Sequence, residues 1–144
     1  MSSQPRERRV SEVEARIIAE IRVLQSYAES IRRSLEQVMA VLQETTITLQ
    51  ELSKIEEQLK ESKEVLIPLG PMVLVRAEIV DPGRVVLNLG AGVYRDVSSS
   101  EARAKLEEYR KELEETASKM QAGLAAVLKR IQELQAVLAS GSAK

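Results

Sequence analysis

The stretch EIVDPGRVVLNLGAGVYRDV, residues 78–97, separates two long segments of a different character. It is rich in valine and glycine, and its alternating apolar residues are typical of short β-strands. The segments before and after it are rich in Glu, Lys, Gln, Ala and Leu, which is typical of long helices. The fold therefore depends on why a largely helical chain carries a small sheet at its midpoint.

The composition of the 144-residue chain excludes several classes of function. There is no cysteine and no histidine, so disulfides, thiolate metal sites and catalysis by either residue are impossible. The 21 basic and 22 acidic residues nearly cancel, which argues against a protein that binds nucleic acid by neutralising phosphates. Aromatic residues make up only 2% of the chain, which favours long helices over a compact globule. We therefore predict one domain that is not an enzyme and holds no metal or cofactor.

No segment of the sequence predicts export or membrane insertion. The first ten residues, MSSQPRERRV, are polar and basic, and no apolar core of a signal peptide follows them. The chain also has no run of about 18 apolar residues. We therefore expect a cytoplasmic protein.

The segment before the central stretch predicts a coiled-coil helix at about residues 6–62. Its apolar residues recur every seven positions, and only a threonine interrupts them. This series is Val10, Ile17, Leu24, Ile31, Val38, Thr45, Leu52, Leu59 and Leu66. A second series follows four residues later, at Ile21, Ala28, Leu35, Leu42 and Leu49. The helix begins either with Pro5 in its first turn or with a capping box at residues 11–14, and we favour the earlier start.

The segment after the central stretch predicts a second helix at about residues 99–139, followed by a tail at 140–144. Ser98 and Glu101 have the spacing of a capping box. The seven-residue series is Leu106, Leu113, Met120, Val127 and Leu134. Its companions are Ala102 and Tyr109 at first and then Ala117, Leu124, Ile131 and Leu138, so the offset shifts near Thr116. Gly123 either permits close helix approach or marks a soft point.

The insert at about residues 65–97 predicts four short strands in two hairpins. The turn signal DPGR occupies residues 81–84, and we interpret Gly90–Gly92 as the bend between the hairpins. Because short hairpins are marginal alone and leave strand edges open, we expect them to join other chains in a β-barrel. The alternative is a sheet packed on its own coiled coil. The residues predicted to mediate assembly are Val73, Val75, Ala77, Ile79, Val85, Leu87, Leu89 and Val93.

Two motifs could suggest nucleotide binding or nucleophilic catalysis, but neither is specific. Gly90–Gly92 lacks the third glycine of a dinucleotide-binding fingerprint and the lysine of a phosphate-binding loop. Ser98–Ser100 begin a helix, and no base stands near them in a recognisable motif, so they are helix-capping residues and not nucleophiles.

Taken together, these elements resemble the alpha class of prefoldin subunits. The specific matches are LIPLG at residues 66–70, VLNLGAGVY at residues 86–94 and the helix start at residues 98–102. Two hairpins resemble the alpha class, since the beta class carries one. The resemblance implies an α+β fold: two long antiparallel coiled-coil helices joined by a small sheet of two β-hairpins, which assembles into an oligomeric β-barrel.

The resemblance also implies a function. It implies an ATP-independent chaperone (holdase) subunit in a hexamer of two alpha and four beta chains. Such a subunit binds unfolded client proteins at the coiled-coil tips and delivers them to a group II chaperonin. The alternative is a structural coiled-coil scaffold whose insert only mediates oligomerisation.

Candidate client-binding residues lie near both ends of the sequence. If the helices pair antiparallel, the second ends near residues 20–25 of the first. The remaining overhang is either a frayed end or an apolar surface for binding. Leu128 and Val137 are favoured because they lie off the main series. The candidates are Val10, Val13, Ile17, Ile21, Val127, Leu128, Ile131, Leu134, Val137 and Leu138.

Overall fold

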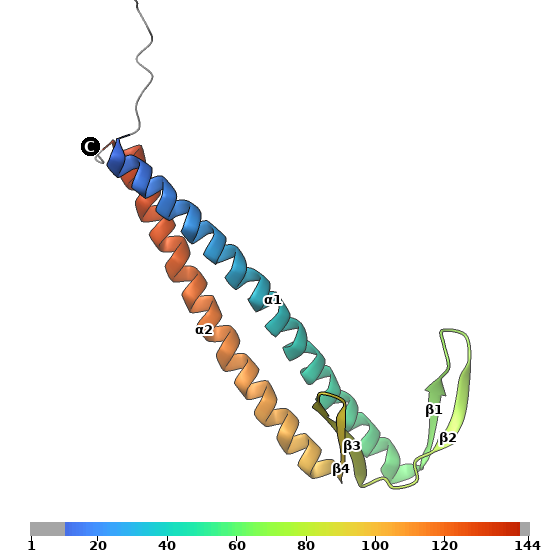
Figure 1. Ribbon diagram of the computed structural model, residues 1–144. Helices are drawn as coiled ribbons and strands as arrows, with labels where there is room; N and C mark the ends of the chain where they lie inside the picture. The colour runs from blue at the N-terminus through green and yellow to red at the C-terminus, as the bar shows by residue number, and fades with distance from the viewer. Residues whose placement is uncertain (1–10, 142–144) are drawn as a thin grey trace, which may run out of the picture. The chain divides into compact units, whose positions relative to one another are not determined.

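The computed structural model describes residues 11–141 as two long helices joined by four strands (Figure 1). The elements are α1 (Glu12–Glu61), β1 (Glu64–Pro68), β2 (Leu74–Glu78), β3 (Arg84–Gly90), β4 (Val93–Ser98) and α2 (Ser99–Ala139). This order confirms the predicted arrangement of helix, paired hairpins and helix.

Both helices begin at serine caps. The backbone N–H of Glu14 donates to Ser11 Oγ at 3.1 Å, and that of Glu101 donates to Ser98 Oγ at 3.1 Å. Each serine thereby satisfies an amide that has no partner within its helix. Helix α1 thus begins at Glu12 within the described residues, and the start near residue 6 that we favoured lies outside them. Pro5 and Val10 lie outside the described residues.

The chain forms two compact units. We call one the helical unit; its described part consists of residues 11–39 and 115–141. We call the other, Ala40–Glu114, the mixed unit; it contains all four strands.

The helical unit buries an apolar seam between antiparallel helix segments. Its core is formed by Ile21, Ile131 and Leu134. Arg130 Nη2 lies 3.5 Å from Glu20 Oε1 beside this core. Five half-buried residues pack against the core: Ile17, Leu24, Val127, Leu128 and Leu138. The start of α1 therefore lies against the end of α2, which confirms antiparallel pairing. The predicted overhang is wrong for Ile17 and Ile21, because α2 extends far enough to pack against both.

The mixed unit contains two separate antiparallel hairpins. In β1–β2, Val65 lies opposite Ala77, and in β3–β4, Val85 lies opposite Val97. The described strands form two sheets of two strands each. Every strand therefore has one edge without a strand partner within the described chain.

The glycine-rich turn lies inside the second hairpin. Gly90 and Gly92 have positive φ angles of 92° and 75°, and Ala91 between them has φ 50°. These residues join β3 to β4, so our interpretation of them as the bend between the hairpins is wrong. The connection between the hairpins is 79–83, where the Gly83 N–H donates to Asp81 Oδ1 at 3.2 Å. An aspartate closing its own turn in this way supplies the bend that DPGR predicted.

The seam of α2 includes two arginines. Tyr109 is exposed, whereas Arg110 is half-buried, so the predicted companion role of Tyr109 is wrong. Ala102, the other early companion, is buried as predicted. The buried and half-buried residues with spacings of four and three are Ser99, Arg103, Leu106, Arg110, Leu113 and Ala117. No shift of offset is needed near Thr116. An apolar pattern missed this seam because long arginine stems can lie along apolar surface while the charged group reaches water.

Gly123 does not serve close helix packing. A Cβ atom added there would meet no atom within 4 Å. Of the two roles considered for this residue, close approach is therefore excluded. A glycine within a helix still costs about 1 kcal/mol relative to alanine.

Candidate interaction surfaces

The residues predicted to mediate assembly all remain accessible in the single chain. Val73, Val75, Leu89 and Val93 are exposed. The other four are half-buried: Ala77, Ile79, Val85 and Leu87. Large apolar patches on a protein surface mark sites of interaction, so the hairpins form a candidate assembly surface.

The apolar surface of the hairpins is larger than predicted. Met72 and Val80 are more than nine-tenths exposed, with values of 92% and 94%. Further exposed residues are Leu66, Ile67, Leu69, Leu74, Val86 and Tyr94. The missed signal was the presence of apolar residues at both alternating positions of a strand, which is typical of strands covered on two faces.

The client-binding candidates fall into two groups in the helical unit. Val13 and Val137 are exposed, at 44% and 36%. The buried ones are the core residues Ile21, Ile131 and Leu134, and the half-buried ones that pack on them are Ile17, Val127, Leu128 and Leu138. Leu128, predicted to lie off the main series, thus contacts the core. Val10 lies outside the described residues.

Three exposed apolar residues of the helical unit were missed by sequence reasoning: Val23, Tyr27 and Met39. Val23 and Tyr27 are 67% and 57% exposed, and they lie one turn apart on α1. Tyr27 also borders an open hollow of about 350 Å³ whose lining includes Ile31, Met120 and Gly123. Their exposure could have been predicted, because they are large apolar residues that lie off the seven-residue series.

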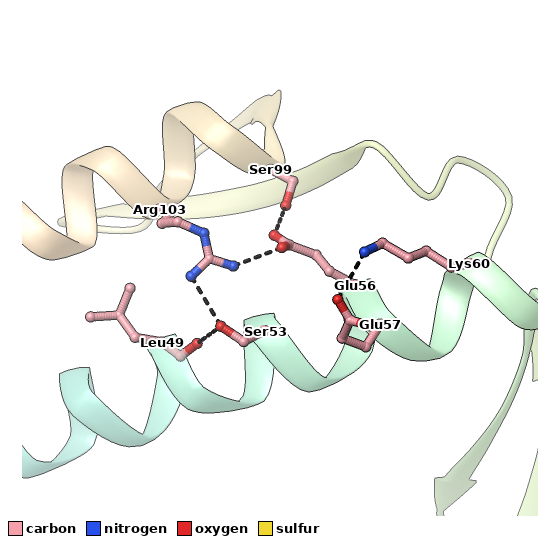
Figure 2. Close-up of polar contacts among 7 residues, drawn as sticks. All are labelled: Leu49, Ser53, Glu56, Glu57, Lys60, Ser99 and Arg103. Carbon is pink, nitrogen blue, oxygen red and sulfur yellow. Dashed lines mark hydrogen bonds and ion pairs between the residues drawn. The ribbon is translucent and has the colours of Figure 1, made fainter.

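A polar cluster crosses from α1 to the start of α2 in the mixed unit. Figure 2 shows Ser99 and Arg103 directed at the Glu56 carboxylate. Ser99 Oγ donates to Glu56 Oε1 at 2.5 Å, and Arg103 Nη2 donates to Glu56 Oε2 at 2.7 Å. Arg103 Nη1 donates to Ser53 Oγ at 3.1 Å, and Ser53 Oγ in turn donates to the Leu49 carbonyl. Both oxygens of the carboxylate therefore have a partner on α2.

The cluster favours the ionised form of Glu56. The Ser99 hydrogen bond lowers the pKa of the Glu56 carboxyl from its ordinary value, and partial burial opposes this effect. The hydrogen bond and charge of Arg103 lower the pKa further. The backbone N–H of Ser99 also donates to the Gly83 carbonyl at 2.9 Å. The start of α2 is thus fixed both to α1 and to the segment between the hairpins. Sequence reasoning treated Ser99 only as part of a cap and did not identify Arg103.

Neither metal binding nor membrane insertion has support in the described residues. Between residues 11 and 141, no group of three or more acidic side chains is placed to hold a metal ion. In the same range, neither helix contains an apolar stretch long enough to cross a membrane.

Comparison with known proteins identifies similar chains. Residues 24–144 match the family model described as prefoldin subunit. The chain is 36% identical to prefoldin subunit alpha of Pyrococcus horikoshii over 118 residues, which cover 80% of this chain and 78% of that protein. It is 32% identical to prefoldin subunit alpha of Methanopyrus kandleri over 127 residues, covering 84% and 76%.

A solved structure also resembles this fold. The chain resembles the filamentous PFD of Methanocaldococcus jannaschii, determined by cryo-electron microscopy, with a TM-score of 0.68. The match covers 82% of this chain and 97% of that chain. At 22% sequence identity it supports the fold alone.

Proposed function

Because the chain belongs to the prefoldin family, as a subunit of its alpha type, and that family is one of chaperones, we propose that it acts as an ATP-independent holdase. It binds non-native proteins and delivers them to a group II chaperonin in the cytoplasm. It does so as part of a hexamer with beta-class subunits, two alpha and four beta chains. The observation that carries this proposal is the large apolar surface on the hairpins combined with apolar residues on the helical unit.

The exposed hairpins support the assembly step. Leu74 and Val75 of β2 are 58% and 37% exposed, and β2 pairs on one edge only within the described chain. A strand with an open edge and an apolar face gains stability by pairing with a strand of another subunit, because both hydrogen bonds and apolar burial become available. We therefore place subunit contacts on the residues predicted for assembly and add Met72 and Val80.

The helical unit supports the client-binding step. Val13, Val23, Tyr27 and Val137 expose apolar atoms on it, while the seam beneath them is buried. Client proteins differ in sequence but all expose apolar side chains when unfolded, so weak and non-directional contacts suit a broad range of them. We place client contact first on these exposed residues. The partly buried candidates also contact clients when the ends of the two helices separate. These residues are Ile17, Val127, Leu128 and Leu138.

Light scattering tests the holdase activity. A denatured, aggregation-prone protein is diluted into buffer with the chain alone, with a beta-class partner alone and with both. We expect a stoichiometric complex of the two subunits to suppress the increase in scattering without ATP. If the assembled complex leaves aggregation unchanged, the chain is a structural scaffold, which is the alternative function.

A truncation separates client binding from assembly. Removal of the residues before Ile21 deletes Val13 and Ile17 and leaves the hairpins intact. We expect client capture to fall while the mass of the assembled complex decreases only by the deleted residues. Equal capture by the truncated and complete chains would show that this segment has no role in binding.

A further inference from the structure

The seam between the helices carries opposite charges on its two sides within the mixed unit. In α1 a series of apolar residues recurs every seven positions up to Leu49, and the next position in that series is Glu56. On α2, Arg103 faces α1, where its guanidinium donates to Ser53 and Glu56. The side chains of Glu56 and Arg103 are only 34% and 33% exposed, so both charges lie at the contact between the helices. A coiled coil normally places apolar residues there.

Stability alone does not explain this choice of residues. Replacing a buried ion pair by apolar residues of similar volume is often neutral or stabilising, because the desolvation of two charges offsets their attraction. An apolar residue at position 56 would continue the α1 series that runs up to Leu49. In other coiled coils a polar residue at a seam position fixes the register and the choice of partner, at some cost in stability.

The charges discriminate between possible partners. In a parallel pair of two α1 helices in register, Glu56 of each chain would lie beside Glu56 of the other. In the same pairing of two α2 helices, Arg103 would lie beside Arg103. Like charges placed together at a seam destabilise both arrangements. Only pairing of α1 with α2 brings the opposite charges together, at the observed distance of 2.7 Å.

The network also discriminates between registers. Ser99 and Arg103 together satisfy both oxygens of the Glu56 carboxylate. Leu106 lies seven residues after Ser99, so a shift of one heptad would place a leucine where the Ser99 hydroxyl donates. A charged carboxylate in a half-buried position would then lose a hydrogen bond that it makes in the observed register.

We infer that Glu56, Ser99 and Arg103 determine which helices of the chain pair and in which register. They select pairing of α1 with α2 over pairing of like helices and over shifted registers. This role concerns the pairing of helices and is independent of client binding. It can therefore be tested separately from the holdase function.

Distance measurement between two spin labels tests this inference. The chain has no cysteine, so cysteines introduced at the exposed positions Gln50 and Glu108 of the mixed unit are labelled selectively. The full chain is measured alone and with a beta-class partner, both undiluted and diluted with unlabelled chain to isolate distances within one molecule. The test variant is Glu56→Leu with Arg103→Leu. The matched control is Glu57→Leu with Lys60→Leu, which removes an exposed pair on α1 whose atoms lie 2.8 Å apart (Figure 2).

The inference predicts different results for the two variants. The test variant is expected to unfold at the same or a higher temperature but to show two or more distance populations and additional self-associated species in native mass measurements. The control is expected to keep the single distance of the unmodified chain. If the test variant keeps one unchanged distance and one mass, the network does not select the pairing. Equal heterogeneity in the control would overturn the inference as well, because added apolar surface would then account for it.

Discussion

The helical unit and the hairpins of the mixed unit differ in how far their apolar side chains are exposed to solvent. The helical unit encloses Ile21, Ile131 and Leu134 between helix segments of the same chain, and each is at most 8% exposed. Met72 in the first hairpin and Val80 in the segment between the hairpins are almost fully exposed. One region therefore completes its apolar contacts within one chain, whereas the other leaves apolar side chains exposed in the single chain.

This difference indicates that one small chain can use one region for folding and another for assembly. A coiled-coil seam needs two helices, and one chain supplies both. A two-stranded hairpin is marginal in water and needs further strands or cover. Apolar residues thus stabilise the chain in one region and are proposed to join subunits in the other, so changes in the two regions should have separable effects.

The largest expected effect is on assembly. Leu87→Asp on β3, or Val75→Asp on β2, places a charge on the surface predicted to join other chains. Burial of an unpaired carboxylate costs several kcal/mol, so we expect the oligomer to disappear while most of the helical circular dichroism remains. Native mass measurement checks the first result and circular dichroism the second.

Asn88→Asp provides the matched control for this prediction. Asn88 is exposed next to Leu87, and its Oδ1 accepts a hydrogen bond from the Gly90 N–H that an aspartate can also accept. We expect this variant to assemble normally. An intact oligomer in Leu87→Asp and Val75→Asp would contradict the assembly role of the hairpins.

A smaller but substantial effect is expected in the helical unit. Ile131→Ala removes buried methyl groups from the seam and leaves a cavity, so it should lower the free energy of unfolding by about 2–4 kcal/mol. Val137→Ala, at an exposed position, should change it by less than about 1 kcal/mol. Denaturant unfolding at one protein concentration checks both. Similar losses for the two variants would show that the seam is not the stabilising element of this unit.

A stabilising change of about 1 kcal/mol is expected at Gly123. Gly123→Ala improves helix propensity and adds a methyl group where no atom lies within 4 Å. Gly92→Ala is the opposite case, because its φ of 75° is unfavourable for alanine, and it should destabilise the second hairpin. Thermal unfolding should therefore shift upward for the first variant. A downward shift for Gly123→Ala would indicate a hidden contact at this position.

The smallest expected effect is a pH dependence in the mixed unit. The pKa of Glu56 is lowered in the folded chain, chiefly by the Ser99 hydrogen bond. Its contribution to stability is therefore complete above the unfolded carboxyl pKa of about 4.3 and is lost as the pH falls through the lower folded value. Partial exposure of the Glu56–Arg103 pair keeps this contribution small. Unfolding temperatures of the unmodified chain and Glu56→Gln should differ at pH 7, and the difference should shrink as the pH falls through the folded pKa of Glu56. A constant difference across this range would exclude an ionised Glu56 as the cause.

Much of the fold could be predicted from the sequence pattern. Where the prediction was wrong, there is a physical cause. The apolar series predicted both helices, and strand alternation with turn residues predicted both hairpins. Pro5 and Ser11 offer competing signals for the start of α1, and the Ser11 cap forms in the structure. Gly90–Gly92 was assigned to the wrong connection, because a glycine turn has the same sequence signature within a hairpin and between hairpins.

The candidate sites were less predictable than the fold. Arg103 was missed because an arginine at a helix contact has no apolar signature, and its partner Glu56 lies 47 residues earlier in the sequence. Leu128 was predicted to be available for client contact because a strict seven-residue series ignores the residues that flank a seam. In the structure it packs on the core. Exposure of individual residues depends on such packing, and a periodic pattern describes only its average.

Native mass spectrometry of the assembled complex mixed with a client shows whether this chain holds clients as part of a hexamer. The chain, a beta-class partner and a denatured client are mixed without ATP, and intact masses are recorded. We predict a species whose mass equals two alpha chains, four beta chains and bound client. An assembled complex that is found only free of client, at client concentrations where aggregation proceeds, would contradict the account.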